Sequence, residues 1–206
     1  MKKLFSILLL FGFLTASAQD PAAFDGKKWR APYHLPTPEG WDIERFPIPA
    51  SFAPSIAYKG VEDIRFTPGW AKSGSNEYWS YAFLWFLDGT QNFTAKILET
   101  HLFAYYTGLF NANTDRTKID TTKLVRVKAT VQSKKAAPGD IKTFGGIVVM
   151  NDYMTRKPIT LNLRVHIKSC EGQNKSFAFF ELSPRPFTDK VWSSLDQLWA
   201  GFRCVQ

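Results

Sequence analysis

Hydrophobic and polar residues alternate strictly along the segment TLNLRVHIKSC, residues 160–170. A period of two is typical of a β-strand with one buried face, so its aliphatic side chains are predicted to enter a core. The same alternation occurs in KLVRVKATV, residues 123–131, and in VEDIRFT, residues 61–67. Three strands are therefore expected, and those over residues 160–170 and 123–131 are expected to have one buried and one polar face.

Other segments are apolar on both faces. EYWSYAFLWFLDG, residues 77–89, contains few polar residues and is predicted to form a central strand that is buried on both sides. IKTFGGIVVMNDY, residues 141–153, and SFAFFEL, residues 176–182, are predicted to be strands as well. The pair Gly145-Gly146 in the first of these indicates a bulge or a close approach of another backbone.

Two segments have apolar residues at helical spacing. A helix is expected over residues 93–107, with Asn92 as its N-cap and Gly108 in a capping position at its end. A second helix is expected near the C-terminus, capped by Thr188 or Ser183. Its apolar stripe consists of Val191, Trp192, Leu195, Leu198, Trp199 and Phe202.

The predicted order of elements is β-β-α-β-β-β-β-α. Four consecutive strands joined by short turns favour antiparallel pairing, which predicts an α+β fold: an antiparallel sheet of about six strands with two helices packed on it. This element order is similar to that of the Mog1/PsbP-like sandwiches, and no site residue is carried over from them. A cystatin-like or nuclear-transport-factor-like sheet with fewer helices is the alternative.

The first 18 residues have the pattern of a secretory signal peptide. Lys2 and Lys3 precede a short apolar run over residues 4–14, and Ala-Ser-Ala at residues 16–18 fits a cleavage site. The run is shorter than the roughly 20 apolar residues of a membrane span. We therefore expect export to the periplasm or the exterior, with no transmembrane segment after cleavage. An uncleaved membrane anchor is the alternative.

Residues 19–56 are rich in proline but also contain several aromatic and aliphatic residues. Proline disfavours long helices and central strands, whereas a disordered linker would lack the large apolar residues. This segment is predicted to be an extended N-terminal arm that packs on a single α+β domain, residues 57–206. A flexible ligand-docking arm is the alternative.

Charge and cysteine content narrow the class of protein. The full chain carries a formal net charge of +8, and without the two lysines of the signal peptide 24 basic residues face 18 acidic ones, about +6. This charge favours an anionic glycan, a lipid surface or an envelope protein as partner, while export argues against nucleic acid.

Cys170 and Cys204 are the only cysteines and are predicted to form a disulfide that clamps the last helix to the sheet. Two free buried thiols are the alternative.

Two groups of residues are candidates for ligand binding. If the strands over residues 123–131 and 160–170 belong to one sheet, their polar faces form a basic patch for phosphate, carboxylate or sulfate groups, consisting of Arg126, Lys128, Arg164, His166 and Lys168. Aromatic residues in loops or at strand starts can stack on sugars or anchor peptides; these are Trp29, Trp41, Trp70 and Tyr78. A solvated sheet face and packing of the arm are the respective alternatives.

No sequence motif identifies a reaction. Zinc-protease, nucleophile-elbow and phosphate-loop motifs are absent from the sequence, so we predict no catalytic residue, no metal site and no cofactor. The chain is best interpreted as an exported, non-catalytic binding or accessory domain of the bacterial cell envelope. One alternative is a carboxylate-dependent hydrolase of envelope glycans, which would use two of Glu62, Asp63, Asp88, Asp152 and Glu181. The other is a structural subunit of an envelope assembly.

Overall fold

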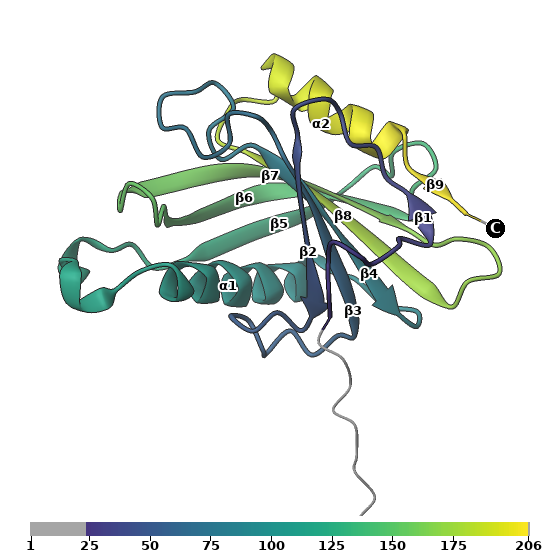
Figure 1. Cartoon of the computed structure of the whole chain (residues 1–206), viewed down its shortest axis with the longest axis horizontal. Coiled ribbons are helices and arrows are strands. Elements are labelled where there is room, and N and C mark those ends of the chain that lie inside the picture. The colour runs from purple at the N-terminus through teal and green to yellow at the C-terminus, as the bar shows by residue number, and fades with distance from the viewer. Residues whose placement is uncertain (1–23, 206) are drawn as a thin grey trace, which may run out of the picture.

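A seven-stranded antiparallel sheet with one helix on each face forms the centre of the structure, a computed structural model that describes residues 24–205 (Figure 1). The predicted signal peptide, residues 1–18, lies outside the described residues. In spatial order the strands are β2 (Asp42–Ile48), β3 (Gly60–Phe66), β4 (Tyr81–Asp88), β8 (Lys175–Ser183), β7 (Pro158–Lys168), β6 (Lys142–Asn151) and β5 (Lys128–Lys134). The predicted α+β class with an antiparallel sheet and two packed helices is confirmed.

The remaining elements are two helices, two single-turn 3₁₀ helices and a small second sheet. They are α1 (Ala95–Ala112), η1 (Arg116–Lys118), η2 (Thr121–Lys123), α2 (Lys190–Ala200) and the paired strands β1 (Tyr33–His34) and β9 (Arg203–Cys204). Within residues 24–205, neither helix combines the length and the apolar composition that crossing a bilayer would require.

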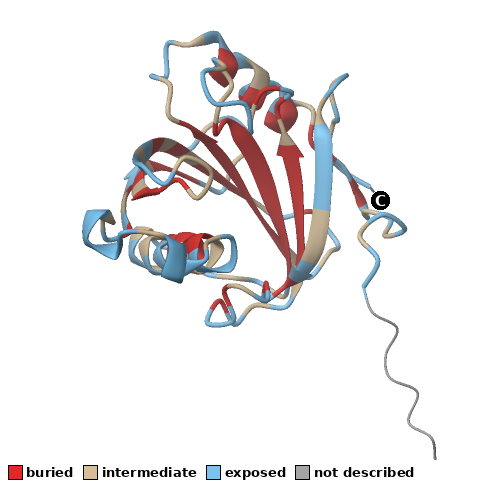
Figure 2. Cartoon of the chain, turned by 60° about the vertical axis from the view of Figure 1, so that its left-hand side comes forward, coloured by how far each residue is buried: buried red, intermediate tan, exposed pale blue. Residues whose placement is uncertain are grey.

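Strands β4 and β8 at the middle of the sheet are buried on both faces (Figure 2). Toward α1, Phe83 and Phe180 stack with ring centroids 4.4 Å apart and belong to the larger core together with the helix residue Leu102. Toward α2, Phe179 stacks on Trp199 at 5.1 Å in a second core. The near-continuous apolar character of both strands therefore follows from their position between two helices.

The N-terminal arm supplies the seventh strand of the large sheet. Strand β2 contains Pro47 and lies at the edge, where a missing backbone N–H breaks no ladder. The arm also satisfies a buried charge, because Asp63 of β3 accepts hydrogen bonds from Tyr33 at 3.0 Å and from Arg45 at 2.8 Å and pairs with Arg65. Arg65 in turn donates to the carbonyl oxygen of Pro36 at 3.0 Å, so the arm is fixed to the sheet by charged groups.

Both predicted helices occur, but their N-caps differ from the predictions. Helix α1 follows Thr94 rather than Asn92 and runs through Gly108, which lies inside the helix instead of capping it. A Cβ atom on Gly108 would lie 1.8 Å from the carbonyl oxygen of Phe52, so the glycine permits close approach of the arm. Helix α2 follows Asp189, whose side chain accepts from the N–H of Val191, rather than Thr188 or Ser183. Local capping chemistry is shared by several neighbouring residues, and packing selects among them.

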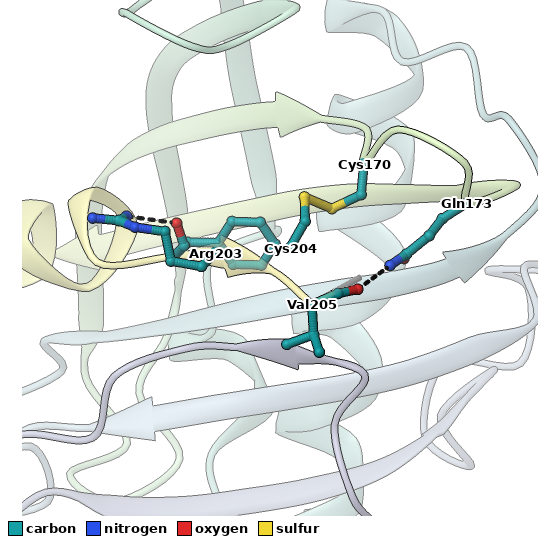
Figure 3. Close-up of a disulfide and its surroundings, with 6 residues drawn as sticks. Cys170, Gln173, Arg203, Cys204 and Val205 are labelled. Carbon is teal, nitrogen blue, oxygen red and sulfur yellow. Dashed lines mark hydrogen bonds between the residues drawn. A yellow bond between two sulfur atoms is a disulfide. The ribbon is translucent and has the colours of Figure 1, made fainter.

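The predicted disulfide is confirmed. Cys170 follows β7 and Cys204 follows α2, with Cα atoms 5.7 Å apart (Figure 3). Beside the bridge, the side chain of Gln173 donates to the carbonyl oxygen of Val205 at 2.9 Å. The end of α2 is thus joined covalently to the end of the sheet.

Replacing both cysteines with alanine should lower the free energy of unfolding by about 3–4 kcal/mol. The bridge closes a loop with a sequence separation of 34, and the chain entropy of the unfolded state accounts for an effect of this size. Urea denaturation of the oxidised wild type, the reduced wild type and the double variant measures it. The two forms without the bridge should agree, and a double variant as stable as the oxidised protein would contradict the prediction.

Candidate functional site

The α2-side face of the sheet is open over strands β5, β6 and β7. Helix α2 packs on β4 and β8, and beside it lies a groove with a volume of about 730 Å³. We call it the β5–β7 groove. Its floor includes Gly145 and the side chains of Thr130, Gln132 and Lys134 from β5, Thr143 and Ile147 from β6, and Asn162, Arg164 and His166 from β7. Its wall includes Phe187, which precedes α2, and Asp196, which lies on α2.

The register of the three strands orders these residues into rows across the sheet. Residues that are paired directly project to the same face, so each row holds one residue of β5, one of β6 and one of β7. The rows are Lys134–Thr143–His166, Gln132–Gly145–Arg164 and Thr130–Ile147–Asn162. The floor is therefore a three-by-three array in which the central position has no side chain.

The glycine at the centre determines where Lys134 lies. A Cβ atom on Gly145 would lie 3.1 Å from Cε of Lys134, so the lysine side chain extends over the glycine. Lys134 makes no ion pair with any residue in the described part of the chain. The neighbouring Gly146 serves the fold instead, because its Cβ would lie 2.0 Å from the carbonyl oxygen of Thr130. The predicted close approach is found at this position, without a bulge.

His166 is held in one orientation by a carboxylate from the β5–β6 turn. Its Nδ1 lies 2.6 Å from Oδ2 of Asp140, which also accepts a hydrogen bond from Thr143 at 2.6 Å. The indole of Trp199 on α2 donates to the other oxygen of Asp140 at 2.8 Å. Nε2 of His166 has no hydrogen-bond partner among residues 24–205, and its nearest carboxylate oxygen is Oε2 of Glu181 at 3.8 Å.

Electrostatics keep this imidazole charged. Burial lowers the pKa of His166, but the hydrogen bond and the charges of Asp140 and Glu181 outweigh burial and raise the pKa to about 9. Burial raises the pKa of Asp140, yet its hydrogen bonds from His166, Thr143 and Trp199 lower it overall. Burial raises the pKa of Glu181, and the nearby His166 and Arg164 only partly offset this effect.

Arg164 connects the groove floor to α2. Its guanidinium lies 3.3 Å from the carboxylate of Glu181 and forms a second ion pair with Asp196. It also lies over the rings of Phe187 and Trp192, at 5.3 and 5.4 Å from their centroids. Arg164 and His166 thus have counter-charges within the protein, whereas Lys134 has none among residues 24–205.

The structure brings together only part of the predicted basic patch. Arg164 and His166 line the groove, and Lys168 shares their face but lies over the rings of Trp199 and Phe202. Lys128 is on the groove-facing side of β5 but outside the groove. The expectation that Arg126 shares this face is not met, because β5 begins only at Lys128 and the Arg126 guanidinium lies over Phe103 of α1.

The predicted aromatic residues lie elsewhere. Trp29 and Trp41 pack at the margin of the α2-side core, and Arg45 lies over the Trp29 ring. Tyr78 donates a hydrogen bond to Asp152, and Trp70 stacks on a phenylalanine of β3. None of the four lines the β5–β7 groove.

The carboxylates considered for hydrolysis are dispersed. Glu62 and Asp63 are successive residues of β3 and project from opposite faces of the sheet. Asp88 is exposed and pairs with Lys175, whereas Asp152 and Glu181 are buried.

Sequence reasoning missed several groove residues. Gln132 and Lys134 continue the alternation of the predicted strand beyond Val131, so extending the pattern would have found them. Asp140 lies in a turn and Asp196 on the polar side of α2, and no local pattern marks either residue. Their role depends on contacts between distant segments.

Alanine at Gly146 should destabilise the protein, whereas alanine at Gly145 should not. The first substitution forces a Cβ against the backbone of β5, at a cost of about 1–3 kcal/mol, while the second meets only the end of a flexible side chain. Urea denaturation of both variants checks this difference. Similar losses for the two variants would show that Gly145 also serves the fold.

Stability that depends on His166 should disappear as the pH rises. The pKa of His166 increases from 6.5 to about 9 on folding, so its contribution is complete below pH 6.5 and is lost as the pH approaches 9. The difference amounts to about 3 kcal/mol. Unfolding free energies of wild type, His166→Gln and the exposed-site control His34→Gln, measured from pH 6 to 10, test this. The decline should be smaller in His166→Gln alone, and parallel profiles for all three would refute the assignment.

The groove is thus a polar site with an aromatic rim and one lysine that lacks a counter-charge. The chain matches no model of a known protein family, and it matches no curated protein sequence. The class of ligand has to follow from the chemistry of the groove.

Proposed function

We propose that this protein is an exported, non-catalytic binding domain of the bacterial cell envelope, and that its β5–β7 groove binds a short segment of a carboxylated glycan. The observation that carries this proposal is the three-by-three polar floor, with Lys134 lying across its centre and forming no ion pair with the residues that the structure describes. The N-terminal export pattern and the Cys170–Cys204 disulfide support an oxidising compartment outside the cytoplasm.

The mixture of groups on the floor suits a sugar. Sugar hydroxyls both donate and accept hydrogen bonds, and the amides of Gln132 and Asn162 do the same. Apolar contacts for the C–H face of a sugar ring are available from Phe187, 47% exposed, and Ile147, 39% exposed. The volume of about 730 Å³ is within the range of about 300–1,000 Å³ of small-molecule sites. An extended peptide would instead pair with a strand edge through its backbone.

The unpaired ammonium of Lys134 favours a carboxylated sugar over a neutral one. Arg164 and His166 pair with the carboxylates of Asp140, Glu181 and Asp196, whereas Lys134 has no ion-pair partner among residues 24–205. A ligand carboxylate can pair with this ammonium and accept a charge-assisted hydrogen bond. Because the site lies near the surface, we expect the attraction to weaken with salt.

A panel of uronate-, muramate- and sialate-containing oligosaccharides, each with its methyl ester, tests the ligand class by calorimetry. At least one acidic oligosaccharide should bind, and its neutral ester should bind about tenfold more weakly. Failure of every acidic oligosaccharide, or equal affinity of acid and ester, would contradict the proposal. Release of reducing ends from a bound ligand would show the hydrolase alternative instead.

Variants on β5 and β6 locate the binding site. Lys134→Gln should weaken binding of the acidic ligand about tenfold and remove most of its preference over the ester. Lys128→Gln is the matched control, because it removes an exposed lysine from the same face of the same strand outside the groove. Gly145→Leu should abolish binding by displacing the Lys134 stem. Equal effects of the two lysine variants would exclude the groove.

A further inference from the structure

A second hollow lies on the opposite face of the sheet, between α1 and the edge of β2 and β3. It has a volume of about 230 Å³ and we call it the aromatic pocket. Eight of its lining residues are aromatic: Phe46, Phe52, Phe66, Trp70, Trp79, Tyr81, Tyr105 and Tyr153. Ile64, Leu109, Asn113 and Glu44 complete the lining, so the walls consist mainly of ring faces and edges.

The two tryptophans are held in place by the loop between β3 and β4. Trp70 stacks on Phe66 at 4.3 Å, and Trp79 packs edge-on against Trp70 at 6.3 Å and Tyr153 at 5.2 Å. The Trp79 N–H donates to the carbonyl oxygen of Trp70 at 2.9 Å. The backbone of Trp79 has φ of 54°, a left-handed conformation that is unfavourable for a bulky residue. The fold thus tolerates strain at a residue that forms part of the pocket wall.

One carboxylate, Glu44, lines this pocket, and no basic residue of the described part of the chain lines it. Glu44 lies exposed on β2 and makes no ion pair with any of residues 24–205. Adjacent to the pocket, the buried Glu62 accepts hydrogen bonds from Tyr105 at 2.6 Å and from Trp85 at 3.0 Å, both neutral donors. Burial raises the pKa of Glu62 to about 8, although both hydrogen bonds lower it. Within the described part of the chain, neither carboxyl group has a cationic partner.

We propose that the aromatic pocket binds an organic ammonium group, with the positive nitrogen against the ring faces and toward Glu44. A cation is attracted by the negative faces of aromatic rings, and the attraction is strongest for tryptophan. Metal cations such as Ca²⁺ require several oxygen ligands, which these rings do not supply. A carboxylate or phosphate would be repelled by Glu44. The small volume suits a compact head group such as a quaternary or methylated ammonium.

Choline and its neutral isostere 3,3-dimethyl-1-butanol have nearly the same shape and differ in charge. Comparing their affinities shows whether the aromatic pocket recognises the positive charge or only an apolar group of this size. Both ligands are titrated into the full protein, and binding is followed by tryptophan fluorescence and calorimetry. Choline should bind about tenfold more tightly than the isostere and should quench or shift the fluorescence of Trp70. Equal affinity of the two ligands, or no binding of choline, would overturn the proposal.

Two variants assign the site. Glu44→Gln changes an exposed residue and should weaken choline binding several-fold without affecting the isostere, whereas the exposed Glu39→Gln is the matched control and should have no effect. Trp70→Leu should remove the choline preference as well. Loss of choline binding in Glu39→Gln, or unchanged binding in Glu44→Gln, would place the ammonium elsewhere. Lys134→Gln should leave choline binding intact, so this proposal and the glycan proposal can fail separately.

Discussion

A helix about 10–12 Å across cannot cover one face of a sheet whose seven strands lie about 4.8 Å apart. In this protein α2 and the N-terminal arm cover β3, β4 and β8 on one face, and β5, β6 and β7 are left open there. This constraint explains the composition of the strands. Strands β4 and β8 are buried on both faces, and the charged residues of β3 on the covered face pair with the arm, whereas β5 and β7 have aliphatic side chains mainly toward α1. The β5–β7 groove is the part of the sheet that no helix reaches.

The boundary between covered and open sheet holds one of the clusters of buried charge among the described residues. His166, Asp140 and Glu181 lie at the edge of α2, and each is stabilised by a partner of opposite charge. Removing one member leaves another buried without compensation, so these residues affect stability and the groove wall together. Arg164 also links the groove wall to the stability of α2, because it forms an ion pair with Asp196 on the helix. The groove residues of β5 form no ion pair with α2 or its edge among the described residues. Substituting them can therefore change ligand specificity without moving α2.

Local patterns predict most of the fold and one strand of the site. The alternation in residues 160–170 correctly places Asn162, Arg164 and His166 on one polar face. The same pattern fails at Arg126, because extended chain outside a sheet also alternates when one side packs on a helix. The contribution of Asp140 depends on a contact across 26 residues, and only the assembled sheet creates it. Alternation thus predicts faces of strands, but not which turn or helix completes them.

The two proposed sites lie on opposite faces of one sheet and have opposite electrostatic character. The groove presents the ammonium of Lys134 to its ligand, and the aromatic pocket presents one carboxylate, Glu44, and ring faces, with no basic residue among its lining. The buried strands between them exclude a single small ligand from reaching both. If both proposals hold, the domain contacts two different chemical groups at once. Under these two proposals, the arrangement suits a rigid connector between two partners, because an enzyme concentrates its functional groups around one substrate.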